Sequence, residues 1–172
     1  MVTANWRGCE GGLRGVLASQ LEELDSKLKA IEQRLLTWRR QDQTSQCLAT
    51  IPGIGPIAGV SFALKVPDAK AFRSGRRFAS WLGITPREDS TAGRQKLGRI
   101  SRAGDEDLRR LLVIGATAVI RAAKPGRTAP WLLALLARKS KKLAAVALAN
   151  KMARIVWAMM VSGETYRWPA QA

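Results

Sequence analysis

The chain has 172 residues, with 29 Lys and Arg against 13 Asp and Glu, so its formal net charge is +16. A charge of this size predicts a polyanionic partner, either a nucleic acid or an anionic membrane surface. Histidine is absent and only two cysteines occur, Cys9 and Cys47, which excludes zinc sites built from Cys/His spacing and any Ser-His-Asp chemistry in this chain.

The positive charge is concentrated in the second half of the chain. Residues 1–72 carry a net +2, residues 73–102 carry +6 and residues 103–172 carry +8, so we expect the partner to meet the second half. The first residues lack the apolar segment of a secretory signal. No apolar run reaches the ~20 residues that span a bilayer, because Lys151 and Arg154 interrupt the longest candidate, residues 143–161. We expect a cytoplasmic protein with no membrane partner, and two lone cysteines fit a reducing compartment.

The N-terminal part predicts a leader followed by a coiled coil. Residues 1–16 are rich in glycine, and we expect them to be a disordered leader. Residues 17–46 predict one long helix, whose apolar side chains recur at alternating spacings of four and three: Leu17, Leu21, Leu24, Leu28, Ile31, Leu35 and Trp38. Such a narrow seam is typical of a coiled coil that joins two copies of the chain. The alternative is an amphipathic helix that packs on its own domain.

A glycine-rich turn follows, in the sequence TIPGIGPIAG at residues 50–59. We expect a helix to end near Ala49 and the next to begin near Pro56, as in a helix-hairpin-helix. Backbone N–H groups at Gly53 and Gly55 would then bind a nucleic-acid phosphate without reading the base sequence. An ordinary tight turn between two helices is the alternative, and the positive charge of the chain favours the phosphate contact.

The remaining pattern is helical, so residues 47–172 are expected to form one all-α domain. Helices are predicted over residues 74–82, with Ser74 as the cap and Arg76 and Arg77 facing outward, and then over 105–123, 130–139 and 141–162. No segment alternates convincingly as a strand does. The fold class is therefore all-α, with room for one small β-hairpin within residues 86–99.

A polar stretch at residues 83–110, GITPREDSTAGRQKLGRISRAGDEDLRR, interrupts the helical pattern. A loop of this length inside a domain is usually functional or disordered. It places two hydroxyls, Ser90 and Thr91, among Arg87, Arg94 and further cations, and guanidinium groups grip phosphate oxygens in bidentate fashion. A loop hydroxyl that bonds only a nearby backbone N–H is the alternative, and composition alone favours that alternative.

Two quoted motifs carry a resemblance to a known family. The run WLGITPREDSTAGRQKLGRISRAGDEDLRRLLVIGA, the upstream IPGIGPIAG and the preceding coiled-coil helix resemble the C-terminal domain of the insertion-sequence transposases grouped as 110/116/902. Members of this family are bridge-RNA-guided serine recombinases, so the resemblance implies DNA transposition in the bacterial cytoplasm, at the nucleoid. Where many members have Gly-Gly-Lys, this chain has Ala92-Gly93-Arg94, which keeps a small backbone and a positive charge.

The resemblance implies roles for individual residues. A loop serine attacks a DNA phosphate, and the match makes Ser90 that nucleophile, with Thr91 as the fallback. Arg87 and Arg94 would stabilise the phosphoryl oxygens in the transition state. Further residues would hold the nucleic-acid backbone: Lys96, Arg99, Arg102, Arg109 and Arg110, together with Gly53, Gly55, Arg76 and Arg77.

The resemblance also implies partners that this chain lacks. The family has an N-terminal RNase-H-like domain whose four acidic residues hold magnesium, and we find no counterpart before Leu17. We therefore expect no metal site and no cofactor in this chain, and DNA, a structured guide RNA and a second copy of the chain as partners. An isolated C-terminal half would bind nucleic acid without recombining it. The alternative function is a non-catalytic DNA- or RNA-binding and dimerisation fragment of a truncated transposase.

Overall fold

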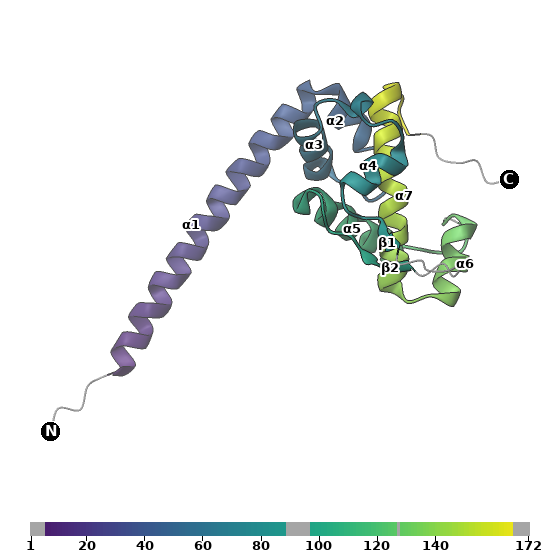
Figure 1. Cartoon of the computed structure of the whole chain (residues 1–172). Coiled ribbons are helices and arrows are strands. Elements are labelled where there is room, and N and C mark those ends of the chain that lie inside the picture. The colour runs from purple at the N-terminus through teal and green to yellow at the C-terminus, as the bar shows by residue number, and fades with distance from the viewer. Residues whose placement is uncertain (1–5, 89–96, 127, 167–172) are drawn as a thin grey trace. The chain divides into compact units, whose positions relative to one another are not determined.

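The structure is a computed structural model that describes residues 6–88, 97–126 and 128–166. It divides into two units, Met1–Trp38 and Arg39–Ala172. The elements in chain order are α1 (Trp6–Gln41), α2 (Gln43–Leu48), α3 (Pro56–Lys65), the short 3-10 helix η1 (Ala69–Ala71), α4 (Gly75–Trp81), β1 (Pro86–Glu88), β2 (Leu97–Ile100), α5 (Glu106–Arg121), α6 (Pro130–Arg138) and α7 (Lys141–Ser162) (Figure 1). The predicted all-α class with a small β-hairpin is confirmed. The second strand of the hairpin ends at Ile100, one residue beyond the predicted range 86–99.

Helix α1 is longer than predicted. It begins at Trp6 rather than Leu17, so residues 6–16 of the expected disordered leader are helical. Each interior glycine costs a helix about 1 kcal/mol, but no proline interrupts residues 6–41. The first five apolar side chains of the predicted seam are each more than half exposed: Leu17, Leu21, Leu24, Leu28 and Ile31.

Helix α1 ends sooner than the expected boundary at residue 46. Asp42 separates it from α2, because the Asp42 carboxylate accepts a hydrogen bond from the Ser45 N–H (2.6 Å) and so caps a new helix. The chain divides into its two units after Trp38, within α1.

The glycine-rich turn joins α2 to α3, as predicted, and packs on α5. Gly53 has a φ of +86°, which favours glycine. A Cβ built on Gly53 would lie 2.7 Å from the Gly115 carbonyl oxygen and 2.8 Å from Val119 Cγ2 of α5. Ile51 and Ile54 on either side are buried. Glycine is therefore favoured at position 53 by the backbone conformation and by the close approach of the turn to α5.

Helix α7 is the central element of the second unit and packs against α2, η1, α4, α5 and α6 (Figure 1). Its core side chains are Ala144, Leu148, Met152, Val156 and Met159. By length and composition alone α7 could cross a membrane. Its apolar side is instead packed inside the unit, and Gly163, with a φ of +73°, ends it as predicted. Core packing accounts for the apolar composition of this helix.

Candidate nucleic-acid site at the β-hairpin

The hairpin pairs the two ends of the polar stretch. Strands β1 and β2 are antiparallel, with Pro86 opposite Ile100 and an irregularity between Pro86 and Glu88. The pairing continues beyond the strands, because the Ser101 N–H donates to the Thr85 carbonyl (3.0 Å). One residue further, the N–H of residue 102 donates to the carbonyl of residue 83, also at 3.0 Å. Both ends of the segment 89–96 are therefore held by backbone hydrogen bonds.

Arg109 anchors this hairpin to the helical unit. Its Nη1 donates to the Leu82 carbonyl (3.2 Å) and to the Gly104 carbonyl (3.1 Å). These carbonyls lie just before β1 and just after β2, so one guanidinium ties the two roots of the hairpin together. Gly104 allows the approach, because a Cβ there would overlap the Trp81 carbonyl oxygen. We expected Arg109 to hold a nucleic-acid backbone, and in the structure its Nη1 makes these two hydrogen bonds within the chain.

The acidic residues beside the hairpin root belong to a local network. Asp105 caps α5, since its Oδ1 accepts a hydrogen bond from the Leu108 N–H (2.8 Å). This bond is the main reason why the pKa of Asp105 lies below its ordinary value. Lys65 Nζ bridges Asp105 Oδ2 (3.0 Å) and Asp107 Oδ2 (2.7 Å), and its pKa is raised chiefly by Asp107. The two carboxylates are thus compensated by one lysine from α3.

Four of the expected phosphate-binding cations lie exposed around the described part of the hairpin. They are Arg87 on β1, Arg99 on β2, Arg102 just after β2 and Arg110 on α5. Arg87 makes one long hydrogen bond, from Nη2 to the Ser101 carbonyl (3.4 Å). Arg102 has a φ of +57°, a conformation that costs a non-glycine residue roughly 1 kcal/mol. Each strand that leads into the segment 89–96 therefore carries one exposed arginine, Arg87 on β1 and Arg99 on β2.

The predicted nucleophile belongs to the segment that joins the two strands. Ser90, its fallback Thr91, and the cations Arg94 and Lys96 lie outside the described residues. The described structure pairs the strands on either side of that segment, and each strand carries one exposed arginine.

The other predicted contacts lie on two further elements. Gly55 is the N-cap residue of α3 and is exposed, with open space where a side chain would project. Gly53, by contrast, packs on α5, so its side of the turn faces inward. Arg76 and Arg77 are exposed on α4, and the Ser74 hydroxyl caps that helix by accepting the Arg77 N–H (3.3 Å).

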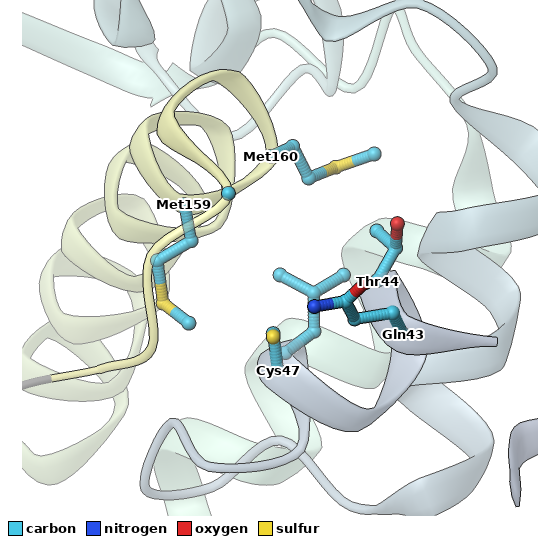
Figure 2. Close-up of a pocket in the computed structure, with 7 residues that line it drawn as sticks. Gln43, Thr44, Cys47, Met159 and Met160 are labelled. Carbon is cyan, nitrogen blue, oxygen red and sulfur yellow. The ribbon is translucent and has the colours of Figure 1, made fainter.

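A pocket of about 170 Å³ lies elsewhere, between α2 and the C-terminal end of α7 (Figure 2). Its lining consists of uncharged and mostly apolar or sulfur-containing residues: Gln43, Thr44, Cys47, Leu48, Met159, Met160 and Gly163. Such a lining offers no cation to a phosphate. The pocket is therefore not part of the candidate nucleic-acid site.

Sequence reasoning missed the residues that position the hairpin. Arg109 looked like one more surface cation, and only its Leu82 partner, far away in the sequence, reveals the anchor. Lys65 was not singled out either, although the helix predicted over residues 105–123 opens with the acids Asp105, Glu106 and Asp107. Lys65 and Asp105 lie 40 residues apart in the sequence, so no local pattern pairs Lys65 with these acids.

Comparison with known proteins matches residues 45–131 to the transposase IS116/IS110/IS902 family. The Sinorhizobium fredii protein y4pF/y4sB, which is named as a transposase, is 49% identical over 86% of this chain and 39% of its own length. The transposase for insertion sequence element IS1328 of Yersinia enterocolitica is 39% identical over 88% of this chain and 44% of its own. The transposase for insertion sequence element IS1111A of Coxiella burnetii is 34% identical over 88% of this chain and 42% of its own length. The chain thus spans less than half the length of these relatives. It belongs to the IS116/IS110/IS902 family of transposases.

Proposed function

We propose that this chain is the part of a transposase that binds DNA and supplies the nucleophile for strand exchange. The hydroxyl of Ser90 attacks a DNA phosphodiester, with Thr91 as the fallback. One ester bond forms between the serine oxygen and phosphorus, and one bond between phosphorus and a deoxyribose oxygen breaks. The serine proton is removed and the departing deoxyribose oxygen is protonated, so the balance needs no oxidant or reductant.

The cations of the hairpin supply the electrostatics for this step. Arg87 and Arg94 stabilise the negative charge that develops on the phosphoryl oxygens. Lys96, Arg99, Arg102 and Arg110 hold the DNA backbone, and nearby positive charge favours the serine alkoxide. Gly55 offers the N-terminus of α3 as a further backbone contact.

The observation that carries the proposal is the anchored hairpin. The segment 89–96 is fixed at both ends by paired strands, and Arg109 fastens the roots of those strands to the helical unit. A nucleophile needs such preorganisation, because a misplacement of 1 Å costs on the order of 10²-fold in rate. Exposed arginines flank the same segment on both strands.

The proposal assigns no step to a metal ion. Within residues 6–88, 97–126 and 128–166, no three Asp, Glu, Cys or His residues lie together as metal ligands would. Magnesium and a structured guide RNA remain expectations for the longer proteins of the family. Bacterial cytoplasm, with DNA at the nucleoid, is the proposed place of action.

A second copy of the chain is proposed as partner of α1. The exposed fractions of Leu17, Leu21, Leu24 and Leu28 lie between 51% and 67%, and burying each leucine would contribute roughly 1.5–3 kcal/mol. Pairing through these leucines would also serve the alternative function, that of a non-catalytic nucleic-acid-binding and dimerisation fragment. That alternative requires α1 and the cations but leaves Ser90 without a role.

Trapping a covalent protein–DNA adduct distinguishes the two functions. The chain is incubated with nicked DNA that carries an element end, together with the part of the Yersinia IS1328 transposase that this chain does not cover, added as a separate polypeptide. The proposal predicts an adduct that survives denaturing electrophoresis, and its loss in Ser90→Ala. Binding without an adduct under these conditions would support the fragment alternative.

A further inference from the structure

A second group of cations converges away from the hairpin, where α4 meets the middle of α7. We name it the α4–α7 basic surface: Arg73, Arg76, Arg77, Lys151 and Arg154, all exposed. Two of these arginines, on α4, were expected from the sequence to touch nucleic acid. Arg73 precedes that pair in the sequence, and the fold brings Lys151 and Arg154 of α7 beside it.

Gly75 shows how closely the two elements meet. It is the first residue of α4 and is buried, and a Cβ built on it would lie 3.3 Å from both Cα and Cβ of Arg154. The same Cβ would lie 3.1 Å from Cε3 of Trp157. Arg76 and Arg77 therefore begin directly beside the stem of Arg154.

A hydrogen bond fastens this junction on the other side. Trp157 Nε1 donates to the Ala69 carbonyl of η1 (3.0 Å), which holds the segment leading to Arg73 against α7. Lys151 lies three residues before Arg154 on α7, so the two occupy neighbouring positions on one helix face. The Lys151 ammonium lies 4.2 Å from the centroid of the Trp131 ring on α6, a contact that positions the charge without neutralising it.

Within the described part of the chain, no acidic side chain forms an ion pair with these charges. Among the described residues none of the five cations takes part in an ion pair, since the pairs there involve only Lys27, Lys29 and Lys65. Between Asp107 and Glu164 the sequence contains eleven Lys or Arg and no acid. Like charges held together in this way raise the free energy of the folded state, and a bound polyanion would offset that cost.

We propose that the α4–α7 basic surface is a second contact for a nucleic-acid backbone, separate from the hairpin. The inference rests on the nucleic-acid role proposed above and adds Arg73, Lys151 and Arg154 to it. The exposed neighbours Ala147 and Ala158 on α7 are small, so the lysine and arginine heads can reach phosphates unhindered. Lysine and arginine heads beside alanines favour contacts with phosphates over contacts with base edges, so binding here should be largely independent of sequence.

The test is the salt dependence of binding, measured by fluorescence anisotropy on the full chain. One variant neutralises the new residues (Arg73→Gln, Lys151→Gln, Arg154→Gln). A matched control removes the same charge from α1 (Lys27→Gln, Lys29→Gln, Arg34→Gln), and a hairpin variant removes it from the proposed site (Arg87→Gln, Arg99→Gln, Arg110→Gln). Each protein is titrated with a labelled DNA duplex and with an RNA hairpin, and unfolding curves establish that it is folded.

Each phosphate contact contributes about 0.9 to the slope of log K against log salt on duplex DNA. The α4–α7 variant is expected to reduce the slope by about 2 to 3 and the affinity by about 10²-fold at ~0.1 M salt. The α1 control should leave both the slope and the affinity close to those of the parental chain. Arg73→Lys with Arg154→Lys should retain binding. If the α4–α7 variant loses more affinity for the DNA duplex than for the RNA hairpin, the partner is DNA. If it loses more affinity for the RNA hairpin, the partner is RNA.

The outcomes separate this inference from the proposed function. If the hairpin variant weakens binding and the α4–α7 variant behaves like the α1 control, the inference is wrong and the hairpin site stands. If only the α4–α7 variant weakens binding, the inference stands and the hairpin assignment fails. If the parental chain binds anionic vesicles but neither nucleic acid, both are wrong.

Discussion

Replacing Arg109 by methionine tests whether this residue anchors the hairpin or binds phosphate. Methionine keeps most of the aliphatic stem and removes the guanidinium. The Leu82 and Gly104 carbonyls would then lose the donor that now lies 3.2 and 3.1 Å away. Both carbonyls flank the hairpin, so its roots are expected to separate from the helical unit.

The cost follows from the two hydrogen bonds. A hydrogen bond to a charged group contributes roughly 1.5–3 kcal/mol, and Arg109 is half-buried, which places both bonds at or below the lower end of that range. The loss should therefore be about 2–3 kcal/mol. For a domain of this size the melting temperature falls by about 3–5 °C for each kcal/mol, so the expected decrease is about 6–15 °C.

Urea unfolding and hydrogen exchange measure this effect. Exchange should accelerate at the Ser101 and Arg102 amides, whose bonds to Thr85 and Gly83 close the hairpin. The control is Arg110→Met, because Arg110 is the exposed neighbour and its loss should cost less than about 0.5 kcal/mol. If Arg109→Met has the stability and exchange of the control, and only the salt dependence of nucleic-acid binding changes, the anchor is refuted and Arg109 is a phosphate contact.

Three further predictions follow from single features. Arg102→Gly should stabilise the chain by about 0.5–1 kcal/mol in urea unfolding, because its φ of +57° favours glycine, and Arg102→Ala should not. The Leu108 N–H lowers the pKa of Asp105 in the folded state, so the carboxylate contributes stability above its unfolded pKa and loses it as pH falls through the folded pKa. The stability of Asp105→Asn should therefore depend less on pH below about 4, and an unchanged dependence would contradict this. Leu24→Asn with Leu28→Asn should lower the mass in light scattering to that of one chain, and an unchanged mass would refute pairing through α1.

The helices of the second unit could be predicted because their signals are local. Ser74 and Ser140 accept hydrogen bonds from N–H groups three residues later, and Gly163 takes the left-handed conformation that ends α7. Apolar spacing then identifies the buried side of each helix. The break at Asp42 was missed, because a single capping aspartate within a helix-favouring sequence is a weak signal against a continuing heptad pattern.

The candidate site could be predicted only in part. Charge and motif indicated the polar stretch and its hydroxyls, and the structure pairs the strands on either side of the segment 89–96 as a small hairpin. Arg109, Arg110, Arg76 and Arg154 all look alike in the sequence, as exposed helical cations. Their different surroundings arise from contacts between segments distant in the chain, such as Arg109 with Leu82, and no local pattern encodes those contacts.

The central claim is that a hydroxyl in the segment 89–96 forms the bond to DNA, and mass spectrometry of the trapped adduct tests it most directly. Trypsin cuts after Arg87 and Arg94, so the peptide 88–94 contains both Ser90 and Thr91. After nuclease digestion, the account predicts a nucleotide attached to this peptide, with fragment ions that place it on Ser90 or, in the fallback, on Thr91. A nucleotide on any other peptide would contradict the account, as would an adduct that persists when both hydroxyls are removed.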